Sequence, residues 1–121
     1  MIKVLIVDDE VDLLEAIRMR LEACGYEAIT AVNGKEAISL IKKKAPDAVI
    51  LDIMMPEMDG LETLREIRSF NRELPVFMLS AYGDGERVKE TEELGIAGFI
   101  YKGTNLSKNV VELINEALKD K

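Results

Sequence analysis

An acidic residue, Asp52, stands directly behind a run of four apolar residues, 48–51, and in front of a loop that contains Met, Pro and Gly. Consecutive apolar residues without alternation are typical of a parallel strand that is covered on both faces. The carboxylate is therefore expected where the end of a buried strand reaches solvent. A second mostly apolar run, 3–7, also ends at acids, Asp8 and Asp9. This repetition predicts a sheet whose strands deliver acids to one edge.

Apolar runs alternate with helical patterns along the whole chain. We predict five strands, at residues 3–7, 26–31, 48–51, 75–80 and 97–101. After each strand, apolar residues recur every three or four positions, which is typical of amphipathic helices. This alternation predicts one domain over residues 1–121, with a doubly wound α/β fold and helices on both faces of a parallel sheet. Five short strands allow several orders, of which the flavodoxin-like order 2-1-3-4-5 is the common solution.

Residues with capping roles mark several predicted helix ends. Gly25 is expected to end the first helix, because glycine readily adopts the left-handed conformation found there. Asn33 is expected to begin the second helix, with a glutamate three residues later. Asn105 is expected to cap the last helix. Cys24, the only cysteine, lies on the apolar face of the first helix and is expected to be buried filler.

Composition argues against several classes of function. The net charge of −7 disfavours direct binding to nucleic acid, which needs a basic surface. No apolar run approaches the roughly 18 residues of a membrane span, and no secretory leader is evident, so we expect a cytoplasmic protein without membrane contact. The chain has no histidine, which excludes His-based catalytic triads and His-ligated zinc.

Ionisable and hydroxyl residues follow four of the five predicted strands. Asp8 and Asp9 end the first strand, Asp52 the third, Ser80 the fourth and Lys102 the fifth. In a doubly wound sheet these carboxyl ends share one edge, where ligands bind at the point of reversed winding. Taken singly, each residue has an ordinary explanation, such as a helix cap, a turn residue or a surface charge. Their joint placement indicates a site.

Three converging carboxylates raise one another's pKa unless a cation lies among them. Their hard oxygen ligands suit a divalent ion, and we expect Mg²⁺. Lys102 adds a fixed positive charge, and Ser80 adds a hydroxyl that can donate to an anion. Asp52 can then act as a carboxylate nucleophile toward a phosphoryl group. Asp47 and Asp59 are competing acids, but Asp47 precedes its strand and turn chemistry explains Asp59.

Four short motifs stand at these strand ends: VDDE at residues 7–10, LDIMMPEMDG at 51–60, SA at 80–81 and GFIYK at 98–102. Together they resemble the receiver domain of bacterial two-component response regulators, and the resemblance covers essentially the whole chain. It implies a signalling domain rather than an enzyme. The implied partners are a sensor histidine kinase or phosphotransfer protein and a downstream output domain or protein. A phosphorylation-dependent homodimer is also compatible with the resemblance.

The resemblance assigns chemical roles to individual residues. It implies that Asp52 is the phospho-acceptor and that Lys102 lies beside it in the reaction. The implied ligands of Mg²⁺ are Asp9 and Asp52, Asp8 through a water molecule, and the backbone carbonyl of Met54. These assignments give the site an acceptor, a metal and a fixed cation.

The resemblance also implies a conformational switch. Ser80 would turn toward the phosphoryl group and Phe99 would move inward. These movements would shift the population between two states of the protein, which differ at the surface formed by helix 4, strand 5 and helix 5. One departure from the family pattern is Gly103, which stands where a proline after a cis peptide is usual. This departure puts in question the resting position of Lys102 and of the last helix.

Three other functions compete with this interpretation. A flavin or dinucleotide module would place glycines or hydroxyls, rather than acids, after the first strand. A Mg²⁺-dependent phosphohydrolase that uses an aspartyl phosphate would need a general acid or base near Asp52, commonly two residues on, where Met54 stands. A docking receiver that never accepts phosphate would not need the complete set of acids, serine and lysine.

Two further hypotheses concern timing and response. Met54 and Tyr82 flank the path of an attacking water and cannot orient it, which predicts a slowly hydrolysing phosphoaspartate. The fourth helix, predicted at residues 84–94, has a thin apolar stripe that consists mainly of Val88 and Leu94. We expect this helix to be the least firmly anchored and to report the phosphorylation state.

Overall fold

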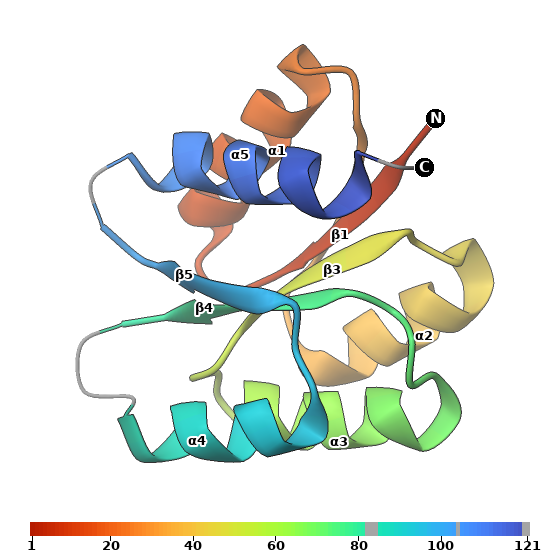
Figure 1. The fold of residues 1–121 in the computed structure, drawn as a ribbon, viewed down its shortest axis with the longest axis vertical. Coiled ribbons are helices and arrows are strands. Elements are labelled where there is room, and N and C mark those ends of the chain that lie inside the picture. Colours follow the sequence, from red (N-terminus) through yellow and green to blue (C-terminus); the bar gives the residue numbers. More distant parts are fainter. Residues whose placement is uncertain (82–84, 104, 120–121) are drawn as a thin grey trace.

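The structure is a computed structural model, and it describes residues 1–81, 85–103 and 105–119. The chain alternates strands and helices (Figure 1). The strands are β1 (Lys3–Val7), β2 (Glu27–Ala31), β3 (Ala48–Asp52), β4 (Val76–Ser80) and β5 (Gly98–Tyr101). The helices are α1 (Val11–Ala23), α2 (Gly34–Lys44), α3 (Gly60–Phe70), α4 (Gly85–Leu94) and α5 (Leu106–Leu118). The alternation predicted from the sequence is confirmed.

The strands form one parallel sheet in the order β2-β1-β3-β4-β5. This is the predicted doubly wound order, and the winding reverses between β1 and β3. Val7 pairs with Leu51, so these neighbouring strands end at nearly the same level. The edge strand β2 is only partly buried, whereas all residues of β3 and β4 are buried. The register therefore carries the residues after β1 and β3 to one edge of the sheet.

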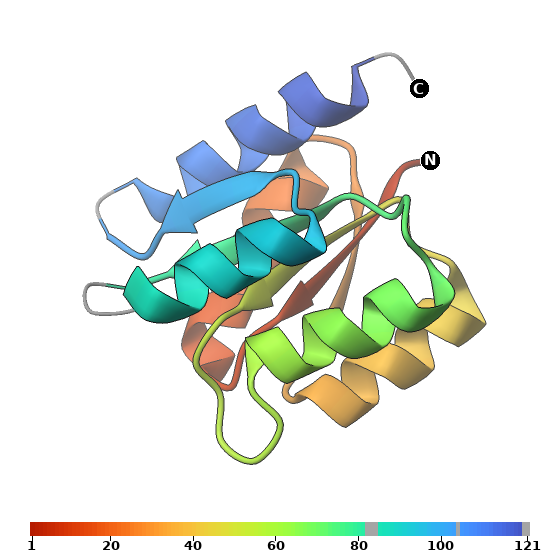
Figure 2. The same cartoon turned by 60° about the horizontal axis from the view of Figure 1, so that its bottom comes forward.

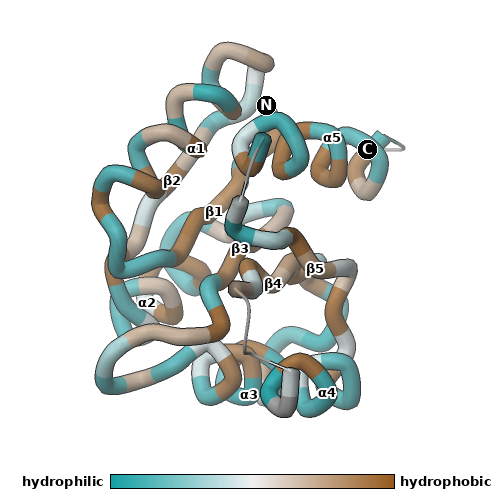
Figure 3. The backbone as a smooth tube through the Cα atoms, turned by 90° about the vertical axis from the view of Figure 1, so that its left-hand side faces the viewer, coloured by the Kyte–Doolittle hydropathy of each residue, from teal (hydrophilic) through white to brown (hydrophobic). Residues whose placement is uncertain are grey.

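Helices cover both faces of the sheet, α1 and α5 on one side and α2, α3 and α4 on the other (Figure 2). Side chains alternate between these sides, because successive residues of a strand point to opposite faces. In β1, Val4 and Ile6 pack on the α1/α5 side, and Leu5 and Val7 pack on the α2/α3/α4 side. Figure 3 shows the resulting hydrophobic centre and the more hydrophilic outer helices. Two apolar layers therefore cover the two faces of the sheet.

The helix ends confirm two predictions and correct two others. The Asn33 side chain accepts a hydrogen bond from the backbone N–H of Glu36, and Gly25 has a φ of 91° just after α1. Cys24 is exposed rather than buried, because α1 ends at Ala23 and Cys24 lies beyond the apolar stripe. Asn105 makes no side-chain cap hydrogen bond, because it adopts a left-handed backbone conformation with a φ of 64°.

No helix within the described ranges is long and apolar enough to cross a bilayer. The described part of the backbone likewise contains no cis peptide bond, so the bond between Lys102 and Gly103 is trans. A Cβ added at Gly103 would meet nothing within 4 Å. The space beside Gly103, next to the lysine, is therefore open.

Candidate functional site

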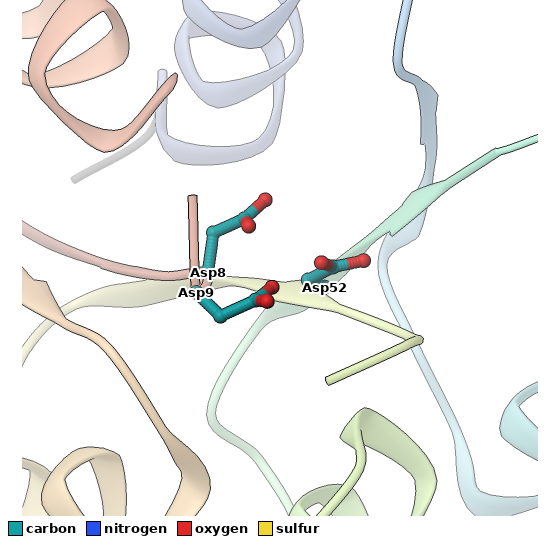
Figure 4. A group of neighbouring side chains, drawn as sticks. All are labelled: Asp8, Asp9 and Asp52. Atoms are coloured by element: carbon teal, nitrogen blue, oxygen red, sulfur yellow. The ribbon is translucent and has the colours of Figure 1, made fainter. Parts of the chain in front are cut away.

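Three carboxylates meet at the carboxyl edge of the sheet. Asp8 and Asp9 directly follow β1, and Asp52 is the last residue of β3 (Figure 4). Each offers an oxygen, and these oxygens all lie within 4.8 Å of one another. Asp8 and Asp52 are buried, with exposed fractions of 0% and 2%, whereas Asp9 is exposed. The paired ends of β1 and β3 thus assemble the acid cluster that the sequence predicts.

Lys102 reaches this cluster from the end of β5. Its Nζ lies 2.7 Å from Asp52 Oδ2, 3.0 Å from Asp8 Oδ2 and 3.4 Å from Glu10 Oε1. Its backbone N–H donates to the Ser80 carbonyl at 2.9 Å, which fixes the start of the side chain beside β4. The predicted lysine is therefore in place. Glu10 was missed as a partner of this lysine, although it directly follows the two aspartates in the sequence.

Hydrogen bonds satisfy part of the acid cluster. The backbone N–H of Glu10 donates to Asp8 Oδ1 at 2.9 Å, and that of Met54 donates to Asp52 Oδ1 at 3.3 Å. Asp8 Oδ2 lies close to Lys102, but among the described residues no donor meets it with hydrogen-bond geometry. A buried carboxylate oxygen without a hydrogen bond is costly unless a cation approaches it. Lys102 already supplies one such cation at 3.0 Å, and the remaining acceptor capacity of this oxygen could also serve a divalent ion.

Burial dominates the electrostatics of the cluster. It raises the pKa of Asp52 to about 6; the hydrogen bond from Lys102 opposes this rise, and the charge of Asp8 adds to it. Burial also raises the pKa of Asp8, against the backbone hydrogen bond from Glu10 and the nearby lysine. Burial lowers the pKa of Lys102, but its contacts with Asp52 and Asp8 outweigh this effect and raise it. One ammonium group thus compensates the carboxylates incompletely.

The donor set fits a hard divalent cation. Carboxylate oxygens at this spacing match the ligands that Mg²⁺ takes, and the exposed side of Asp9 leaves room for the water molecules that Mg²⁺ keeps. Asp8, Asp9 and Asp52 are the residues that would hold it. The backbone carbonyl of Met54 stays a predicted ligand. Its N–H donates to Asp52, which places Met54 next to the cluster.

Ser80 and Phe99, the predicted switch pair, lie on neighbouring strands. Ser80 ends β4 and is 2% exposed; its Oγ lies 3.5 Å from the carbonyl of Ala81. Phe99 is half-buried in β5 and packs on the α2/α3/α4 side. Tyr82, predicted to flank the path of water, lies outside the described residues. The hydroxyl therefore stands at the correct edge, and its turning toward a phosphoryl group stays a prediction.

Tight packing behind Asp52 is a feature that the sequence analysis missed. A Cβ added at Gly60 would lie 2.1 Å from the Asp52 carbonyl oxygen. The N–H of Gly60 donates to the Ile53 carbonyl at 2.8 Å. The preceding Asp59 caps α3, since its side chain accepts from the N–H of Glu62 at 3.0 Å. The Asp-Gly pair could have suggested this close approach, because only glycine fits it.

Comparisons with known proteins agree with this geometry. A family model described as the response regulator receiver domain matches residues 4–115. The "Probable transcriptional regulator ycf27" of Guillardia theta is 44% identical over 101 residues, which are 83% of this chain and 39% of that protein. "Transcriptional regulatory protein ZraR" of Klebsiella oxytoca is 34% identical over 97% of this chain and 26% of its own length. The chain thus spans less than half of these relatives.

Solved structures share the whole fold. The receiver domain of NtrX from Brucella abortus superimposes with a TM-score of 0.89 at 33% identity, covering 98% of this chain and 99% of that one. The chemotaxis protein CheY4 of Vibrio cholerae gives a TM-score of 0.89 at 31% identity with the same coverage. Sequence, fold and the acids at the sheet edge lead to one conclusion: this chain belongs to the family of response regulator receiver domains, the signalling domains of two-component systems.

Proposed function

We propose that the chain is a phosphorylation-activated switch and that Asp52 accepts the phosphoryl group from a sensor histidine kinase or a phosphotransfer protein. The observation that carries this proposal is the position of Asp52, buried at a strand end and bonded by Lys102 at 2.7 Å beside two further acids. A carboxylate in such surroundings can act as a nucleophile and has a fixed cation beside it. An aspartate with a purely structural role needs neither the nucleophilicity nor the cation.

In the proposed step an Asp52 carboxylate oxygen attacks the phosphorus of a phosphohistidine. The phosphorus–nitrogen bond breaks, its electron pair stays on the imidazole nitrogen, and an acyl phosphate forms on Asp52. Lys102 lies next to the attacking oxygen, so its ammonium can donate to an oxygen of the transferred group. When bound, Mg²⁺ would neutralise negative charge on the phosphoryl oxygens during the transfer. Asp8 and Asp9 would contribute ligands for that ion.

We further propose that the response leaves through the α4/β5/α5 surface, by way of Ser80 and Phe99. The half-buried position of Phe99 supports this route, because an aromatic side chain at the surface can move inward when space opens. The partner would be an output domain, a separate protein or a second copy of the chain. The names of ycf27 and ZraR refer to transcriptional regulators, so an output in transcription is the favoured case. We place this activity in the cytoplasm.

A signalling role is favoured over an aspartyl-phosphate phosphohydrolase. Met54 stands two residues after Asp52, is 49% exposed and carries no group that transfers a proton. A hydrolase needs a general acid or base near the nucleophile. The pocket is therefore suited to forming an acyl phosphate rather than to turning it over. The complete set of acids and lysine likewise favours phosphorylation over a role as a docking surface alone.

The proposal is tested by incubating the protein with Mg²⁺ and acetyl phosphate and measuring the intact mass. We expect the mass of one added phosphoryl group in the wild type and none in Asp52→Ala or Asp52→Asn. Asp12→Asn, which removes an exposed acid in the first turn of α1, is the matched control and should be phosphorylated normally. Equal phosphorylation of Asp52→Asn and the wild type would contradict the assignment of the acceptor.

A further inference from the structure

The helix α4 has little apolar attachment to the rest of the molecule. Among its described side chains only Thr91 is buried, and Val88 and Leu94 are half-buried. Its principal neighbour is α3, which lies beside it in both ribbon views (Figures 1 and 2). A helix of this composition needs other contacts to keep its position, because burial supplies most helical stability in proteins.

Polar contacts follow the α3–α4 interface from end to end. Arg87, in the first turn of α4, forms an ion pair with Asp59, the N-cap of α3. Arg65 lies 3.1 Å from Glu90 in the middle. Arg68 donates to the carbonyl of Gly95, beyond the end of α4, at 2.8 Å. The two helices therefore run side by side in the same direction and are joined at three levels.

Of the two ion pairs between α3 and α4, the Arg87–Asp59 pair is the less exposed to solvent. The Asp59 and Arg87 side chains are 13% and 40% exposed, whereas Arg65 and Glu90 are 56% and 50% exposed. Exposed pairs contribute little to stability because water and salt screen them. The Arg87–Asp59 pair should thus contribute more to the position of α4.

Asp59 is also connected to the phospho-acceptor strand. The next residue, Gly60, approaches the Asp52 carbonyl so closely that a Cβ there would be 2.1 Å away. Its N–H donates to the carbonyl of Ile53. The other oxygen of Asp59 accepts from the N–H of Glu62 and holds the start of α3. A displacement of the backbone after Asp52 would therefore reach Asp59 directly and, through it, Arg87.

We propose that the Arg87–Asp59 pair holds the first turn of α4 against the corner that follows Asp52 and so favours the resting position of this helix. The pair is a second connection between the acceptor and α4, separate from Ser80 and Phe99. A partly exposed ion pair alters an equilibrium by about two- to fivefold, which is small enough for a phosphoryl group to overcome. By reciprocity, a pair that favours the resting state weakens binding of a phosphoryl mimic by the same factor.

Hydrogen exchange of residues 85–94 tests the pair in the resting protein. Asp59→Asn is the sharpest variant, because asparagine caps a helix as well as aspartate does but lacks the charge. We expect exchange in α4 to rise about two- to fivefold in Asp59→Asn and in Arg87→Gln, with no further rise in the double variant. Arg87→Lys should restore part of the protection. Arg65→Gln, the matched control, should change exchange less than twofold.

Beryllofluoride with Mg²⁺ tests the coupling to the acceptor. Arg87→Gln should bind this phosphoryl mimic more tightly than the wild type by the factor seen in exchange, an effect that a merely structural residue would not produce. Unchanged exchange in Arg87→Gln, additive effects in the double variant or unchanged affinity for the mimic would each overturn the proposal. A wild type that does not respond to the mimic would contradict the proposed function of Asp52, and the exchange measurement would still decide the role of the pair.

Discussion

The helices α5 and α4 flank the same strand, β5, but are held in different ways. In α5 the buried residues form a complete stripe, consisting of Leu106, Val110, Val111, Ile114 and Leu118. In α4 only Thr91 is buried among the described side chains, and ion pairs formed by arginines join this helix to α3. Apolar burial is insensitive to small changes of charge, whereas ion pairs respond to them. The difference teaches that a helix with little apolar burial can be attached to its neighbour largely by charge.

The largest expected effect contrasts the two apolar stripes. Ile114→Ala in α5 should lower the free energy of unfolding by about 2–5 kcal/mol, because it leaves a cavity in the core. Val88→Ala in α4 should cost about 1 kcal/mol or less, since Val88 is only half-buried. Urea denaturation measures both values. Equal losses in the two variants would show that α4 is packed as firmly as α5.

A pair of glycines sharpens the comparison at the level of the backbone. Gly60→Ala should destabilise the protein by about 1–3 kcal/mol or more and reduce phosphorylation, because its Cβ would overlap the Asp52 carbonyl. Gly85→Ala, at the start of α4, has nothing within 4 Å of the added Cβ and should leave stability unchanged or slightly higher. Thermal unfolding and the mass assay with acetyl phosphate measure the two effects. A tolerated Gly60→Ala would disprove the tight contact.

The comparison also predicts where phosphorylation is reported. On binding beryllofluoride with Mg²⁺, amide exchange should change several-fold in α4 and little in the C-terminal half of α5, because weakly anchored elements shift most readily. Hydrogen exchange with mass spectrometry resolves the two helices. Equal protection of α4 in both states would remove the basis for calling it the responsive helix.

The smallest expected effect separates the hydrolysis of the acyl phosphate from the response of α4. Met54→Asn should shorten the lifetime of the acyl phosphate a few-fold, because an amide can orient the attacking water that Met54 cannot. It should leave exchange in unphosphorylated α4 unchanged, since Met54 lies at the acid edge and not at the α3–α4 interface. Loss of the phosphoryl mass over time gives the rate. An unchanged rate would refute the explanation based on Met54.

Much of this fold could be predicted because its signals are local. Strand and helix periods indicated the doubly wound class, and the order that is common in this class matched the sheet. The acids that follow β1 and β3 were then sufficient to predict the cluster of Asp8, Asp9 and Asp52. Errors arose where one residue decided the outcome. Cys24 lies one position beyond its helix, and Asn105 adopts a left-handed conformation instead of capping α5. Helix ends vary by a residue or two, and a periodic pattern does not fix them.

Contacts between distant residues were the other limit. The sequence around Asp59 predicted a turn, which agrees with its position at the start of α3. Its pairing with Arg87 depends on how α4 lies on α3, and the sequence did not predict it. The contact of Glu10 with Lys102 joins residues 92 positions apart. Long side chains reach many partners, so sequence spacing alone cannot select one. The meeting of the three acids at the sheet edge was thus predictable, and the contact of Asp59 with α4 was not.

Strand alternation has a consequence for insertions and deletions. By the alternation seen in the two core layers, Asp52 continues the positions of β3 that face α1 and α5, whereas Ser80 continues the positions of β4 that face α2, α3 and α4. Adding or removing one residue within β4 would turn Ser80 to the opposite side of the sheet while leaving its chemistry intact. The length of β4 is therefore as restricted as its sequence, and changes of length should be tolerated better in the loops at the amino ends of the strands, away from the acid cluster.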